Sequence, residues 1–133
     1  MSQTIRQRYL ADQVLTASRE RLVTLLYDGL ASSIARASAA ISSGDHYASN
    51  EALIKAQGIV LELQRSLKLD VWDGAARLLS IYHYLYRRLI EANLRKDPAI
   101  TAECLALVEP LQVAWHQAAA ILGAERQAAA LAS

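Results

Sequence analysis

Apolar residues recur at steps of three and four positions along most of this chain, and few prolines or glycines interrupt them. Such spacing is typical of amphipathic α-helices, so we predict four long helices and no strand. The expected helices span 18–42, 46–67, 74–96 and 98–123. Because short loops join helices of similar length, the pattern predicts an all-α fold, namely an antiparallel up-down-up-down four-helix bundle.

Capping residues mark the expected helix boundaries. Ser18 can accept from the first free N–H groups of the first helix, and Glu20 places negative charge at the positive end of the helix dipole. Gly44 is a stop signal for that helix, and Asp45 is suited to capping the next one. Asp97 is expected to cap the last helix, which has a proline in its first turn.

The last helix carries two residues that disturb the pattern. Pro110 lacks a backbone donor and clashes with the preceding turn, which predicts a kink near Ala106. Gly123 is expected to end the helix and to leave an alanine-rich, frayed tail. The predicted organisation is a mobile N-terminal segment at 1–17, a bundle at 18–123 and a C-terminal tail at 124–133.

An apolar stripe on each of the last three helices is predicted to face the core, because its members repeat with the spacing of a packing seam. On the second helix this stripe comprises Leu53, Ala56, Val60, Leu63 and Leu67. On the third helix it comprises Leu78, Tyr82, Leu85 and Leu89. On the fourth helix it comprises Ile100, Cys104, Leu107, Leu111, Ala114, Ala118 and Ile121.

The second helix has a further apolar line beside its stripe, formed by Ile54, Gly58 and Leu61 with Gln57 next to it. A helix that is apolar on two sides has more surface to bury than a four-helix core requires. Two interpretations stay open: a broad buried face, or a hydrophobic groove that accepts an amphipathic helix from another protein. Gly29 lies within the first helix, where glycine costs about 1 kcal/mol relative to alanine, so a closely packed second helix is expected there.

Composition narrows the class of protein. The net charge is +1, and the basic residues are scattered among acidic ones, which argues against a nucleic-acid ligand. The apolar runs are far shorter than the ~20 residues of a membrane helix, so no membrane insertion is expected. The single cysteine, Cys104, cannot form an internal disulfide, and the N-terminus lacks the apolar core of a secretory signal. These features predict a cytoplasmic protein.

The reactive residues do not form a recognisable catalytic or metal-binding motif. Di-iron bundles need Glu-x-x-His pairs, but the residues three positions before His46, His83 and His116 are serine, serine and valine. Cys104 falls on a packing stripe, where a thiol is expected to pack as a small hydrophobe. His83 leaves one alternative, a histidine phosphotransfer bundle, because such domains carry a reactive histidine on an exposed helix face. We otherwise expect a binding module, not an enzyme, with no cofactor and no metal.

Several short motifs together resemble those of a known family. They are Thr16-Ala17-Ser18 with Leu22-Val23, Leu26-Tyr27-Asp28-Gly29, Lys55-Ala56-Gln57, Ser66-Leu67 and Tyr86-Arg87-Arg88-Leu89. In this order and spacing, they make the chain similar to the FliS family of flagellin export chaperones over roughly residues 9–121.

The resemblance implies a cytoplasmic chaperone that binds the disordered C-terminal segment of flagellin in a hydrophobic groove. Such a chaperone prevents premature polymerisation and assists delivery to the flagellar type III export apparatus, with export-gate components as further partners. The resemblance also implies an N-terminal cap over the groove, to which we assign Ile5, Tyr9, Leu10 and Val14.

The candidate groove residues come from two sources. The spacing on the second helix supplies Ile54, Gln57, Gly58 and Leu61. The family motif adds Tyr27 and Gly29. Each of these two residues could either contact flagellin or support the bundle, and the sequence leaves both roles open. A bundle that regulates another flagellar partner is an alternative function, and the sequence also leaves open a homodimer of the free protein.

Overall fold

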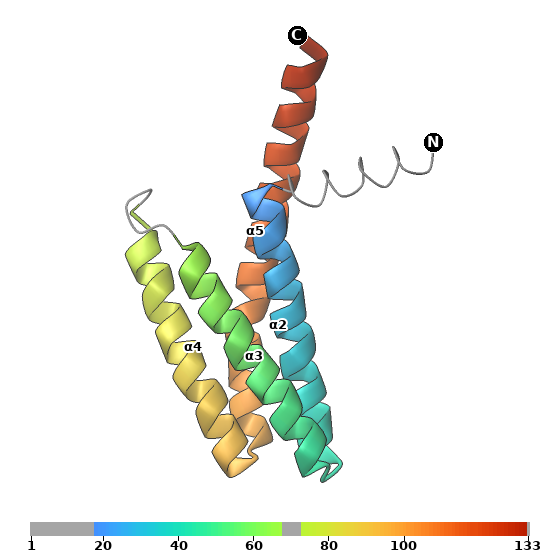
Figure 1. Ribbon diagram of the computed structural model, residues 1–133, viewed down its shortest axis with the longest axis vertical. Helices are drawn as coiled ribbons and strands as arrows, with labels where there is room; N and C mark the ends of the chain where they lie inside the picture. Colours follow the sequence, from blue (N-terminus) through green and yellow to red (C-terminus); the bar gives the residue numbers. More distant parts are fainter. Residues whose placement is uncertain (1–17, 68–72, 133) are drawn as a thin grey trace, which may run out of the picture.

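Four α-helices make up the part of the chain that the structure describes, residues 18–67 and 73–132 of a computed structural model. They are α2 (Arg19–Ser42), α3 (His46–Ser66), α4 (Ala75–Arg95) and α5 (Pro98–Ala132), and no strand occurs in these ranges. Consecutive helices run in opposite directions (Figure 1). The packed pairs are α2–α3, α3–α4, α4–α5 and α2–α5, so each helix has two neighbours. The prediction of an all-α antiparallel bundle is confirmed.

Side-chain caps explain where three of these helices begin. Ser18 Oγ accepts a hydrogen bond from the backbone N–H three residues later, at 3.3 Å. Asp45 Oδ1 likewise accepts from the backbone N–H three residues later, at 3.0 Å. The preceding residue, Gly44, has a positive φ of 76°, which is typical of a glycine that ends a helix. Asp97 Oδ1 accepts the backbone N–H two residues later, at 2.9 Å. The starts of α2, α3 and α5 therefore lie at or next to the predicted positions.

The core of the bundle contains the predicted stripes of α3 and α4. The buried members are Leu53, Ala56, Val60 and Leu63 on α3 and Leu78, Tyr82, Leu85 and Leu89 on α4, whereas Leu67 is half-buried. The hydroxyl oxygens of Tyr27 and Tyr82 lie 2.6 Å apart in this core. Their hydrogen bond joins α2 to α4 and pairs two polar groups that would be costly to bury alone.

The predicted stripe of α5 is correct for its first half and wrong for its second half. Ile100 and Cys104 are buried, but Ala114 is exposed and Ile121 is 60% exposed. Ala114 lies off the side of α5 that contacts the bundle, and α5 has 35 residues against 21 to 24 in the other described helices, so its last turns project beyond them (Figure 1). Along α5 the buried side continues instead through Val108 to the half-buried Trp115.

The expectation that Gly123 ends the last helix is also wrong, because α5 continues through it to Ala132. The surrounding alanines are the strongest helix formers, which offsets the helix cost of about 1 kcal/mol for one glycine. The expected frayed tail is therefore helical as far as Ala132. Pro110 lies inside α5, and the kink near Ala106 stays a prediction, as does the division of the chain into segments.

Candidate binding groove between α2 and α3

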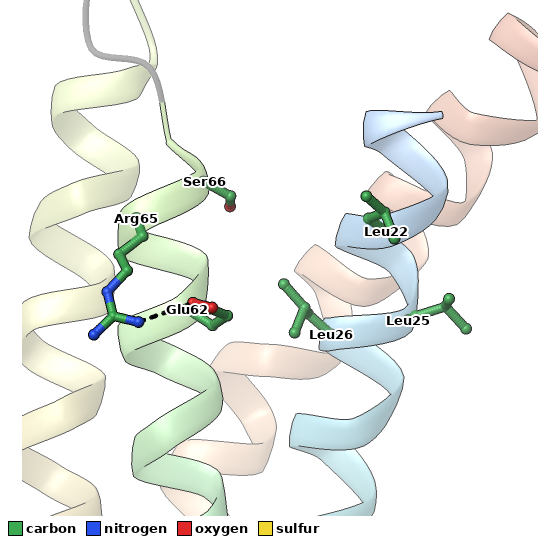
Figure 2. A pocket seen from close by; sticks show the side chains of 6 residues that line it. All are labelled: Leu22, Leu25, Leu26, Glu62, Arg65 and Ser66. Atoms are coloured by element: carbon green, nitrogen blue, oxygen red, sulfur yellow. Dashed lines mark hydrogen bonds and ion pairs between the residues drawn. The ribbon is translucent and has the colours of Figure 1, made fainter. Parts of the chain in front are cut away.

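An apolar hollow of about 520 Å³ opens between the first turns of α2 and the last turns of α3. Figure 2 shows its lining, which comprises Leu22, Leu25 and Leu26 of α2 and Glu62, Arg65 and Ser66 of α3. We call this hollow the α2–α3 groove and its three leucines the α2 wall. Leu22 and Leu25 are 49% and 53% exposed, so the free protein leaves large apolar side chains in water here.

The α2 wall exists because α2 is apolar on two sides. Val23, Tyr27 and Leu30 follow a spacing of four and three, and all three are buried in the core. The α2 wall residues lie beside this stripe: Leu25 and Leu26 follow Leu22 by three and four positions, and all three border the hollow between α2 and α3. The α2 wall has the same sequence signal as the second apolar line on α3: the helix has more apolar positions than one buried stripe needs. These three leucines are not among the groove residues predicted from the sequence.

The predicted line on α3 is exposed but lies beside the α2–α3 groove. Ile54 is 55% exposed, Leu61 is 37% exposed and Gly58 is also exposed, whereas Gln57 is half-buried. None of these four residues lines the α2–α3 groove. Ile54 instead lines a second hollow of about 420 Å³ near the start of α3, together with polar side chains such as Arg36. The structure therefore places the predicted line on the outer face of α3.

The two glycines have more room than a close helix crossing would leave. A Cβ atom built on Gly29 would lie 3.4 Å from the nearest side-chain atom, Ile59 Cδ1, which is an ordinary contact distance. Around Gly58 no atom lies within 4 Å of such a Cβ atom. Helix α3 does pack beside Gly29, but packing among the described residues does not demand a bare backbone at either position.

Tyr27, the remaining candidate of the groove, faces the core. Its side chain is fully buried, its hydroxyl is paired with that of Tyr82, and its ring stacks on Trp115 with the ring centroids 6.4 Å apart. Burial raises the pKa of the Tyr27 hydroxyl, so the group is a neutral hydrogen-bonding partner. The four residues assigned to the N-terminal cap, Ile5, Tyr9, Leu10 and Val14, lie outside the described residues.

Helix α5 supports α2 on the side away from the groove. Asp28 Oδ1 accepts a hydrogen bond from Gln112 Nε2 at 2.8 Å and lies 2.7 Å from His116 Nε2. Hydrogen bonds to Gln112 and His116 hold the pKa of Asp28 below its ordinary value. This carboxylate therefore joins α2 to α5 in its charged form at neutral pH.

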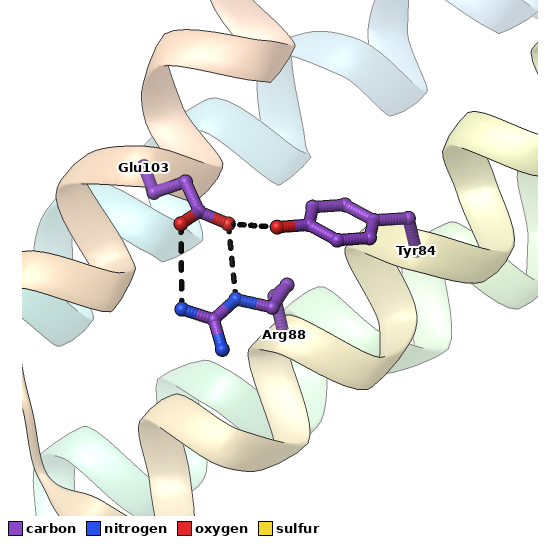
Figure 3. Close-up of polar contacts among 3 residues, drawn as sticks. All are labelled: Tyr84, Arg88 and Glu103. Carbon is purple, nitrogen blue, oxygen red and sulfur yellow. Dashed lines mark hydrogen bonds and ion pairs between the residues drawn. The ribbon is translucent and has the colours of Figure 1, made fainter.

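The pair α4 and α5 is joined by a polar cluster on the surface (Figure 3). The Tyr84 hydroxyl donates to Glu103 Oε1 at 2.7 Å, and Arg88 donates to both carboxylate oxygens of Glu103, at 2.9 and 3.3 Å. The hydrogen bonds from Tyr84 and Arg88 hold the pKa of Glu103 below its ordinary value. Arg88, which belongs to the motif at residues 86–89, therefore joins α4 to α5.

The residues that could be reactive are either packed in the core, as Cys104 is, or exposed to solvent, as His83 is. Cys104 is buried, and burial raises the pKa of its thiol to about 12, so it remains protonated. His83 is exposed on α4, and its exposure is the only described feature in favour of phosphotransfer. Within residues 18–67 and 73–132, the histidine, cysteine and acidic side chains do not gather into a group that could hold a metal ion.

The described fold and groove define a class of protein: an all-α bundle that exposes an apolar groove between two of its helices. A family model described as flagellar protein FliS matches residues 1–122. The chain is 37% identical over 110 residues to flagellar secretion chaperone FliS of Bacillus subtilis, covering 83% of this chain and 82% of that protein. The proteins of the same name from Escherichia coli and Salmonella typhimurium are 35% and 38% identical, with 78% of each chain covered. The chain belongs to the FliS family.

A further observation concerns membranes. Of the helices that the structure describes, α2 to α5, none has the combination of length and apolar character that crossing a bilayer requires.

Proposed function

We propose that this protein is a flagellar secretion chaperone that binds the C-terminal segment of flagellin in the α2–α3 groove. The observation that carries the proposal is the exposed α2 wall in a chain whose relatives are named flagellar secretion chaperones. Binding keeps flagellin from polymerising early and assists its delivery to the type III export apparatus, whose gate components are further partners. The protein acts in the cytoplasm, by binding and without catalysis.

The physical basis of binding is coupled folding. A disordered segment that becomes an amphipathic helix on a preformed surface buries about 1,000 to 3,000 Å² of surface. Part of the resulting free energy offsets the entropy lost when the segment becomes ordered. Binding is then specific because the apolar face must fit the groove, and it stays reversible because the net free energy is modest.

The proposal divides the candidate residues by position. Leu22, Leu25 and Leu26 receive the client helix, and the exposed Ile54 and Leu61 extend the contact over the outer face of α3. Gln57, Gly29 and Gly58 lie at half-buried or exposed positions along that path, whereas the buried Tyr27 supports the bundle. The segment that contains Ile5, Tyr9, Leu10 and Val14 is proposed to cap the groove until flagellin docks. Self-association of the free protein through the same surface is a competing use of the groove.

The test compares two leucines of similar chemistry. We expect Leu22→Asp to weaken binding of flagellin more than tenfold, because it places a charge in the apolar groove, and to leave the fold intact because aspartate is favoured in the first turn of a helix. Leu94 is 78% exposed at the end of α4, so Leu94→Asp should change the affinity less than twofold. Isothermal titration with intact flagellin and with flagellin lacking its C-terminal segment measures both effects.

Equal binding of intact and truncated flagellin would contradict the proposed client segment. Equal affinity of wild type and Leu22→Asp would show that the groove is not the binding site. If flagellin does not bind at all while another flagellar protein does, the alternative of a regulatory bundle is favoured.

A further inference from the structure

The first turn of α2 holds a buried carboxylate that pairs with the projecting end of α5. Glu20 is only 8% exposed, and its Oε1 atom is buried from solvent. Arg126 Nη2 forms an ion pair with this oxygen, and the arginine side chain is 57% exposed. Because glutamate is almost never fully buried unless it is paired, the contact with Arg126 explains how the carboxylate is accommodated.

The position of this pair gives it a link to the α2–α3 groove. The α2 wall begins at Leu22, two residues after Glu20, so it occupies the first turns of the same helix. Toward this end α2 and α3 separate (Figure 1), and the hollow between them leaves the α2 wall without support from α3. The contacts to α5 therefore contribute to holding these turns in place, together with the buried Val23 and Tyr27.

The contacts between α2 and α5 have a clear order along α2. Trp115 stacks on Tyr27, and Gln112 and His116 bond Asp28, all between two and three turns past the start of α2. Among the described residues, the pair of Glu20 and Arg126 is the one ion pair that reaches the first turn. It is also made by a residue of α5 beyond Gly123, in the part that the sequence predicted to be a frayed tail.

We infer that Arg126 is a positioning residue of the α2–α3 groove, which holds the first turn of α2 through Glu20 so that the α2 wall is in place before a client docks. The inference deepens the proposed function and rests on it for the identity of the client. Through this contact, the alanine-rich end of α5 supports the groove without lining it.

The electrostatics explain why loss of the arginine matters. Burial alone would raise the pKa of Glu20, but its own backbone N–H, the hydrogen bond and charge of Arg126 and the Ser18 hydroxyl together hold that pKa below its ordinary value. The carboxylate is therefore charged at neutral pH. Without Arg126 a buried charge loses its partner, and the first turn gains by moving Glu20 into water.

The experiment uses the full chain with Arg126→Gln and a matched control, Glu125→Gln. Glu125 is the exposed neighbour of Arg126 and makes no ion pair within the described ranges. We expect Arg126→Gln to raise the Kd for the C-terminal peptide of flagellin by roughly three- to tenfold, an effect typical of residues that act without touching the ligand. The control should stay within twofold of wild type. The double variant Glu20→Gln with Arg126→Gln should recover much of the affinity, because it leaves no unpaired buried charge.

Amide hydrogen exchange of the free protein separates this inference from the proposed function. Faster exchange at residues 22–26 in Arg126→Gln, with unchanged exchange in the middle of α3, is the expected result. If wild type binds the peptide and Arg126→Gln binds it equally well, the inference is wrong and the proposed function stands. If wild type does not bind the peptide, the proposed function fails, and the exchange at residues 22–26 alone decides whether Arg126 positions this turn.

Discussion

The two helix pairs α4–α5 and α2–α3 are built from similar antiparallel helices, yet their outer edges differ. Three hydrogen bonds from Tyr84 and Arg88 to Glu103 cross the α4–α5 edge. None of the side-chain hydrogen bonds among the described residues joins α2 to α3, and the leucines of the α2 wall lie at that edge instead. Hydrogen bonds between two helices use up the polar groups at that edge, whereas exposed leucines without such bonds leave the edge free to bind a ligand. The comparison therefore favours the α2–α3 edge as the binding side.

The largest expected effect separates the two sides of α2. Leu30 is fully buried, so Leu30→Ala should lower the free energy of unfolding by about 2 to 5 kcal/mol through lost burial and a new cavity. Leu25 is 53% exposed, and Leu25→Ala should change that free energy by less than about 0.5 kcal/mol. Urea unfolding of both variants measures the difference. A large loss for Leu25→Ala would mean that the α2 wall belongs to the core and is not a free surface.

A smaller effect of opposite sign is expected at the glycines near the open edge. Gly58→Ala and Gly29→Ala should each raise the free energy of unfolding by about 0.5 to 1 kcal/mol, because a methyl group fits at both sites and alanine favours the helix. If the client helix approaches the backbone there, the same variants should bind flagellin less tightly. Stabilised variants with unchanged affinity would place the client path away from these glycines.

The smallest effect concerns the bridged edge and its response to acid. The folded pKa of Glu103 lies below its unfolded value of about 4.3, so its contribution to stability is present above that value and is lost as the pH falls through the folded pKa. Glu103→Gln should therefore show a smaller drop in Tm between pH 5 and pH 3, approximately, than wild type does. Glu109→Gln is the control, since this exposed glutamate makes no ion pair among the described residues. An equal drop in Tm for wild type and both variants would show that the α4–α5 bridge has no electrostatic effect on stability.

The sequence predicted the parts of the fold that depend on spacing within one helix. The stripes through Val60 on α3 and Leu85 on α4 are buried as expected, because each helix has a partner along its whole length. The stripe of α5 fails at Ile121, since periodicity does not reveal where the neighbouring helices end. Helix continuation past Gly123 was missed for a related reason: a single glycine does not outweigh the alanines around it.

The candidate site was predicted less completely than the fold. The outer position of Ile54 and Leu61 follows from the period of α3, and the structure places both on an exposed face. The α2–α3 groove depends on how far two helices separate at one end, which no local pattern specifies. Tyr27 shows the limit of a motif, because the motif identifies the residue but not whether its side chain points into the core.

The exposed α2 wall also links occupancy to heat resistance. An occupant of the groove covers Leu22 and Leu25, which the free protein leaves about half in water, and it binds only the folded chain. A ligand present at a hundredfold excess over its Kd adds about 2.7 kcal/mol to the free energy of unfolding. Under the proposed function, protection is therefore mutual: the flagellin segment that is kept from polymerising early raises the melting temperature of the protein that holds it.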